Sequence, residues 1–68
     1  MARTYSQQKA GLTRALKKGP SAVLAECKRT VDEWNTDPAF PAWPDDWHRW
    51  NIARQDAEYA LRREEAGL

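Results

Sequence analysis

Proline placement constrains the fold of this 68-residue sequence more than any other feature. Pro20 directly follows Gly19, and the other three prolines occupy every third position from Pro38 through Pro41 to Pro44. Proline fixes its own φ angle and lacks a backbone N–H, so it is excluded from the interior of a helix. These positions divide the chain into three segments of helical length.

The first segment is predicted to be a helix over residues 5 to 18. Thr4 and Gln7 match a capping box, in which two side chains satisfy amide groups that the first helical turn leaves unpaired. The predicted apolar stripe is thin and consists of Tyr5, Leu12 and Leu16. Residues 1 to 3 are expected to be frayed.

The second helix is predicted over residues 20 to 35. Gly19 suits the conformation that ends a helix and Pro20 suits the first turn of the next, so the two helices should form a hairpin. The apolar residues at helical spacing are Val23, Leu24, Cys27, Val31 and Trp34. This wide apolar face predicts that the second helix lies against both of the others.

The third and longest helix is predicted over residues 44 to 65. Pro44 would stand in its first turn, with Asp45 and Asp46 at the positive end of the helix dipole. Its predicted apolar face consists of Trp50, Ala53, Ala57, Ala60 and Leu61, with Trp47 at the margin.

The remaining aromatic residues complete the predicted core. Trp34, Trp47 and Trp50 are expected to be buried together, and Phe40 and Trp43 are expected to fold back over them as a lid. The prolines could instead form a ligand for an aromatic groove on another protein. The sequence thus predicts an all-α fold, with residues 1 to 68 in one small three-helix domain. A helical hairpin is joined to a longer C-terminal helix by a proline-rich segment, and a tryptophan cluster seals one end.

Charge is unevenly distributed along the chain. Residues 1 to 30 hold seven Lys and Arg against one Glu, whereas residues 31 to 68 hold four Arg against nine Asp and Glu. The basic half could pack against the acidic half, or it could contact phosphate. The second interpretation predicts a small DNA- or RNA-binding protein that uses the basic face of the first helix. Its candidate residues are Arg3, Lys9, Arg14, Lys17 and Lys18.

Residues suited to catalysis or metal binding are few. His48 is the only histidine, and Cys27 is the only cysteine and lies on an apolar helix face. Asp45 and Asp46 are adjacent, and successive helix positions diverge by about 100°. We therefore expect no catalytic, metal or cofactor site. A single cysteine, with no apolar run long enough for a membrane span and no secretion signal, predicts a cytoplasmic protein.

A second surface of the third helix carries His48, Ile52, Gln55 and Tyr59, which lie away from its predicted core face. The first helix could cover this surface. Alternatively, the surface is exposed and binds a protein partner or a second copy of the chain. The function predicted from the sequence is therefore a non-enzymatic, protein-binding or regulatory module, with nucleic-acid binding as the alternative.

The segment from Trp43 to Ala57, WPDDWHRWNIARQDA, resembles short uncharacterised helical proteins of actinobacteria and their phages. The resemblance implies no activity and no functional residues. A phage origin would favour a host-directed binding protein or a small regulator over an enzyme.

Overall fold

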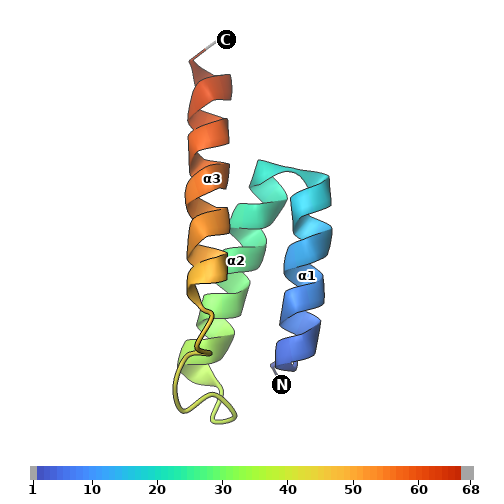
Figure 1. Cartoon of the computed structure of the whole chain (residues 1–68), viewed down its shortest axis with the longest axis vertical. Helices are drawn as coiled ribbons and strands as arrows, with labels where there is room; N and C mark the ends of the chain where they lie inside the picture. Colours follow the sequence, from blue (N-terminus) through green and yellow to red (C-terminus); the bar gives the residue numbers. More distant parts are fainter. Residues whose placement is uncertain (1, 67–68) are drawn as a thin grey trace.

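The computed structural model describes residues 2 to 66, and within them the chain forms three α-helices and no strand (Figure 1). α1 spans Tyr5–Lys18, α2 spans Pro20–Thr36 and α3 spans His48–Glu65. α1 and α2 form a hairpin, and α3 packs against α2. The predicted all-α fold, the hairpin and the central position of α2 are confirmed. Within the same residues, no helix is both long enough and apolar enough to cross a membrane.

The N-terminus of α1 has the predicted capping box. The backbone N–H of Gln7 donates to Thr4 Oγ1 at 3.2 Å, and the backbone N–H of Thr4 donates to Gln7 Oε1 at 2.8 Å. A cap of this kind stabilises a helix by about 1 kcal/mol. The start of the helix is therefore determined locally.

The buried face of α1 differs from the predicted stripe. Its buried residues are Gln8, Gly11, Leu12 and Ala15. Leu16 was expected in the core, but it is 57% exposed. The prediction was wrong here because α1 packs mainly on α2, and small or polar residues on that side let the helices approach closely. A Cβ atom at Gly11 would lie 2.6 Å from Glu26 Oε2, so the missing side chain makes room for this carboxylate.

The turn between α1 and α2 is formed by Gly19 and Pro20. Gly19 has a φ angle of 124°, which residues with a side chain rarely adopt, and its N–H donates to the Ala15 carbonyl at 3.1 Å. Pro20 occupies the first turn of α2, where the missing N–H costs no helical hydrogen bond. The predicted end of α1 before Gly19 and the predicted start of α2 at Pro20 are confirmed.

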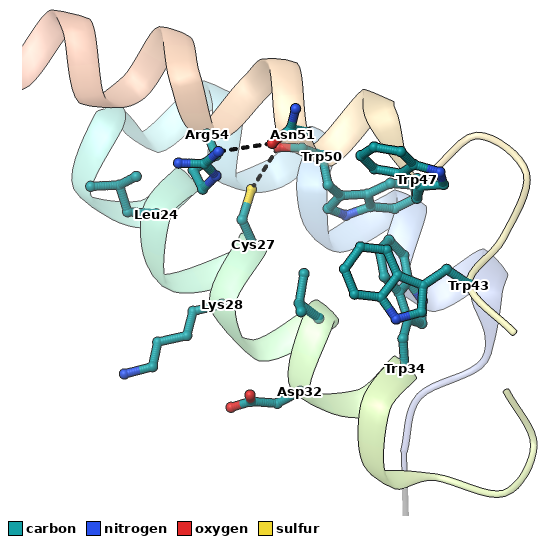
Figure 2. A pocket seen from close by; sticks show the side chains of 11 residues that line it. Leu24, Cys27, Lys28, Asp32, Trp34, Trp43, Trp47, Trp50, Asn51 and Arg54 are labelled. Carbon is teal, nitrogen blue, oxygen red and sulfur yellow. Dashed lines mark hydrogen bonds between the residues drawn. The ribbon is translucent and has the colours of Figure 1, made fainter. Parts of the chain in front are cut away.

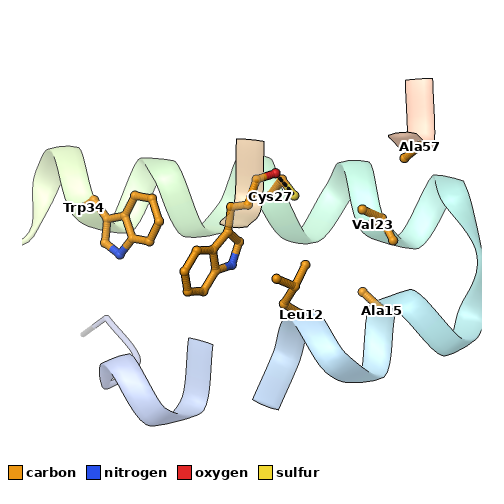
Figure 3. Close-up of a cluster of buried hydrophobic side chains, with 7 residues drawn as sticks. Leu12, Ala15, Val23, Cys27, Trp34 and Ala57 are labelled. Carbon is orange, nitrogen blue, oxygen red and sulfur yellow. Dashed lines mark hydrogen bonds between the residues drawn. The ribbon is translucent and has the colours of Figure 1, made fainter. Parts of the chain in front are cut away.

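All three helices contribute to the hydrophobic core (Figure 3). The buried apolar residues are Leu12, Ala15, Val23, Cys27, Trp34, Trp50 and Ala57. The rings of Trp34 and Trp50 meet edge to face with their centroids 5.0 Å apart, and the Cys27 thiol donates to the Trp50 carbonyl at 3.4 Å. The predicted burial of Trp34, Trp50 and Cys27 is confirmed.

α3 begins at His48 and not near Pro44, so its predicted start was wrong. The backbone N–H of Trp47 donates to the Pro44 carbonyl at 3.0 Å, and that of Arg49 donates to the Asp46 carbonyl at 2.9 Å. These bonds join residues three apart, which makes a tight turn before the helix proper. Asp45 and Asp46 consequently precede the helix.

Two further predictions need correction. Trp47 was expected in the core but is 41% exposed, because it precedes the first turn of α3 and lies at the edge of the helix interface. Residues 2 and 3 were expected to be frayed, but the N–H of Ala2 donates to Asp37 Oδ2 at 3.2 Å and that of Arg3 to Glu33 Oε2 at 2.9 Å. Met1 lies outside the described residues.

Candidate interaction surfaces

A groove lined by all four tryptophans lies between α2 and α3 (Figure 2). Trp34 from α2 and Trp50 from α3 are buried at its floor, whereas Trp43 and Trp47 each remain 41% exposed. The ring centroids are 5.5 Å apart for Trp34 and Trp43 and 5.8 Å apart for Trp43 and Trp47. The expected lid is thus formed in part: Phe40 packs against the core, while Trp43 covers Trp34 with one side open to solvent.

The groove has a volume of about 430 Å³ and is mainly apolar, with charged residues at its rim. Leu24 and Val31 extend the apolar lining along α2. Lys28 and Asp32 stand on the α2 side of the rim, and Arg54 stands on the α3 side. Arg54 forms an ion pair with Glu58 and donates to Asn51 Oδ1 at 2.8 Å. We shall call this feature the tryptophan groove.

Hydrogen bonds hold some of the indole rings in place. The Trp43 N–H donates to Asn35 Oδ1 at 2.8 Å, and the Trp34 N–H donates to Gln8 Oε1 at 2.9 Å. The buried Trp50 N–H has no acceptor among the described residues. An unpaired buried donor costs about 1 to 3 kcal/mol, so packing of the Trp50 ring must outweigh this penalty.

The outer surface of α3 carries the residues that the sequence proposed for partner binding. His48, Ile52, Gln55 and Tyr59 are all exposed, with Ile52 at 54% and Tyr59 at 63%. α1 does not cover them, because the residues that Tyr5 of α1 contacts are Trp50, on the core face of α3, and Asp46, in the turn before that helix. The His48 ring lies 6.0 Å from that of Trp47, centroid to centroid, so this surface adjoins the tryptophan groove.

Arg3, one of the proposed nucleic-acid contacts, is engaged inside the hairpin. Its guanidinium contacts Glu26 Oε2 at 2.5 Å and Glu33 Oε1 at 2.7 Å, and it donates to Thr30 Oγ1 at 3.1 Å. The side chains of Arg3, Glu26 and Glu33 are only 13 to 14% exposed. Hydrogen bonds with Glu33 chiefly raise the pKa of Arg3 against the opposing effect of burial.

The other proposed cations have different surroundings on α1. Lys9 stands over the Tyr5 ring, with its Nζ atom 4.7 Å from the ring centroid. Arg14 and Lys18 face a groove between α1 and α2, whereas Lys17 does not line it. Lys9 therefore lies apart from Arg14 and Lys18, and the proposed nucleic-acid contacts of α1 remain a prediction.

The titratable groups near the core have structural partners. Burial raises the pKa of the Cys27 thiol, which is 2% exposed. Burial and a hydrogen bond to Asp46 raise the pKa of Tyr5, and the same bond from the Tyr5 hydroxyl lowers the pKa of Asp46. The Tyr5 to Asp46 bond joins the start of α1 to the turn before α3.

Sequence reasoning found the individual tryptophans but missed the groove they form. The sequence did contain one signal for it. Trp43 lies in the predicted proline-rich segment and Trp47 at the margin of the predicted apolar face of the third helix, so both large rings could be expected at the edge of the core. Comparison with models of protein families, with curated proteins and with solved structures found no match for this chain.

Proposed function

We propose that this protein is a small non-catalytic module that binds another protein through the tryptophan groove. One observation carries the proposal: Trp43 and Trp47 remain 41% exposed in the tryptophan groove, and the Trp47 ring lies beside His48, on the face of α3 that also carries the exposed Ile52 and Tyr59. Exposed apolar surface of this kind marks interaction sites on soluble proteins. Tryptophan and tyrosine are also the residues that most often dominate binding energy.

A helix with an apolar stripe is the partner element that suits this groove. The described residues contain no strand edge, so an extended peptide would find no row of backbone groups to pair with. A helix satisfies its own backbone and needs only a matching apolar surface. The rim carries both positive and negative side chains, from Lys28, Asp32 and Arg54. They suit a partner helix with charged residues of both signs beside its apolar stripe.

The chemistry of the candidate reactive groups supports a non-catalytic role. A buried thiol with a raised pKa is a poor nucleophile, which argues against Cys27 as a reactive residue. Asp46 is held by Tyr5 and Arg49, and His48 lies against the Trp47 ring. A host-directed partner is the first class to test, on the expectation from the sequence that the segment from Trp43 to Ala57 resembles proteins of actinobacteria and their phages.

The test is affinity capture followed by titration with the purified captured protein. Trp47→Ser removes an exposed ring from the groove, and Ile52→Ser with Tyr59→Ser removes the adjoining α3 surface. Leu16→Ser is the matched control, because Leu16 is 57% exposed but lies outside both surfaces. Circular dichroism establishes that each variant is folded.

The proposal requires a captured protein that binds the wild-type chain and the Leu16→Ser variant equally in calorimetric titrations, including at high salt. Trp47→Ser should weaken this binding at least tenfold, which corresponds to about 1.4 kcal/mol. Self-association that Trp47→Ser abolishes would identify the partner as a second copy. Binding that is the same for all variants would refute the proposal.

A further inference from the structure

A second groove lies between α1 and α2 and is lined by basic residues. Its volume is about 540 Å³. Arg14 and Lys18 line it from α1, and Arg29 lines it from α2. The small residues of its lining are Gly11, Ala15, Ala22 and Ala25. We shall call this feature the basic groove.

The cations of the basic groove are not neutralised within the described part of the chain. Arg14, Lys18 and Arg29 are exposed, and none of them forms an ion pair with another residue between positions 2 and 66. Glu26 is the one carboxylate in the lining, and Arg3 binds it at 2.5 Å. The pair of Arg3 and Glu26 contributes no net charge, so the groove retains three positive charges.

The acidic half of the chain leaves these charges free. Glu33 is the only carboxylate of residues 31 to 66 that pairs with a cation of α1 or the segment before it, and that cation is Arg3. The other described ion pairs, Arg49 with Asp46 and Arg54 with Glu58, lie within the C-terminal half. The uneven charge of the sequence is therefore preserved on the surface of the hairpin.

We infer that the basic groove binds the phosphate backbone of a nucleic acid without reading its sequence. Two of the three free cations are arginines, whose planar guanidinium groups bind phosphate oxygens in pairs. Arg14 and Lys18 stand about 6 Å apart along the helix axis, so they can follow consecutive positions on an extended polyanion. Small residues between the cations leave room in the groove for the phosphate backbone of a nucleic acid.

An acidic protein segment suits the lining less well. No uncharged polar side chain lines the groove, and Glu26, its one carboxylate, is paired with Arg3. The side chains of the lining therefore offer few acceptors for the N–H groups of a peptide backbone. Phosphate oxygens need only the donors that Arg14, Lys18 and Arg29 supply. Because every sequence presents the same phosphate oxygens to these three cations, the binding is expected to be independent of sequence.

The test is fluorescence anisotropy with a labelled mixed-sequence DNA duplex. Three phosphate contacts predict a salt slope near −2.7, which is roughly a 40-fold loss of affinity between about 50 and 200 mM salt. Arg14→Glu combined with Arg29→Glu should abolish binding at the lower salt concentration. Lys17→Glu combined with Arg62→Glu makes the same change in net charge outside the groove, and it should retain most of the affinity.

Several results would overturn the inference. These are no binding at low salt, an equal loss in the two charge-reversal variants, or tighter binding of polyglutamate than of DNA of equal charge. Should the glutamate variant lose its helical circular dichroism, Arg14→Gln with Arg29→Gln gives the same comparison without charge repulsion. The Trp47→Ser variant should bind DNA normally, so this inference and the proposed protein-binding function can fail independently.

Discussion

At the scale of single residues, Arg3 ties the segment before α1 to α2. Its guanidinium bridges Glu26 and Glu33 on α2 and also bonds Thr30, which is fully buried. Glu33 Oε1 lies in addition 3.4 Å from Gln8 Nε2 on α1. A residue just before α1 is therefore part of the packing between the first two helices.

Replacing Arg3 with Met should lower the free energy of unfolding by roughly 2 to 4 kcal/mol. The change leaves Glu26 and Glu33 largely buried without a cation, and a partly buried carboxylate in that state is costly. Urea denaturation measures the loss. Arg14→Met is the control, because Arg14 is exposed and its replacement should change stability by less than about 0.5 kcal/mol. Equal effects of the two substitutions would show that the Arg3 network contributes nothing.

The same network predicts a loss of stability in acid. Burial acts to raise the pKa of Glu33, but its hydrogen bonds with Arg3 outweigh that effect and lower the pKa below its ordinary value. The contribution is complete above the unfolded-state pKa of about 4.3 and is lost as pH falls through the folded-state value. Urea midpoints measured from about pH 6 to 3 should therefore fall more steeply for the wild-type chain than for Arg3→Met. Parallel pH profiles would contradict this account.

At the scale of elements, α2 and α3 each carry one buried tryptophan. The other two tryptophans lie in the segment between these helices. Trp50 is 1% exposed, whereas Trp47 is 41% exposed. The two residues stand one helical turn apart but have different neighbours. Trp50 contacts Trp34 and Tyr5, and Trp47 contacts Trp43 and His48.

Truncation of the two rings should therefore have unequal effects. Trp50→Ala should cost about 3 to 5 kcal/mol and unfold much of the population, because a large cavity would open in the core. Trp47→Ala should cost about 1 to 2 kcal/mol and leave the helical circular dichroism intact. Chemical denaturation followed by circular dichroism at 222 nm measures the free energy of unfolding of both variants. Similar losses for both variants would show that Trp47 is a core residue and remove the basis for an exposed groove.

At the scale of the whole molecule, the three helices form an elongated body of 43 by 18 by 18 Å. α2 lies between its neighbours, and the C-terminal end of α3 extends past the turn between α1 and α2 (Figure 1). This arrangement leaves one groove where α2 meets α3 and another where α2 meets α1. The proposed protein and nucleic-acid surfaces can thus be occupied independently.

Small-angle scattering should detect this shape. The Cα radius of gyration is 12.8 Å, whereas a compact domain of this length is expected to have about 11 Å. The scattering of the monomer should therefore give a value clearly above that of a compact domain, with mass determined in parallel by light scattering. A monomer with a radius near 11 Å would show that α1 and α3 close around α2 into a tighter bundle.

Local chemistry in the sequence determined the helices and most of their ends. The capping box of Thr4 and Gln7 and the pair Gly19 and Pro20 act through neighbouring backbone groups, so they could be recognised without tertiary information. The apolar face of α2 is wide enough to predict that this helix contacts both of the others, and both contacts are present. Trp34 and Trp50 could be placed in the core for the same reason.

Only the tertiary structure decided which side chains those helices bury and which they leave exposed. Leu16 and Trp47 are as apolar as many core residues, but the helix that packs beside each one leaves it at an edge. Gln8 and Arg3 are polar, yet partners distant in sequence satisfy them: Trp34 for Gln8, and Glu26 and Glu33 for Arg3. The burial of a side chain and its hydrogen-bond partners depend on contacts between helices, and the spacing of apolar residues along one helix does not specify those contacts. Both grooves follow from those contacts.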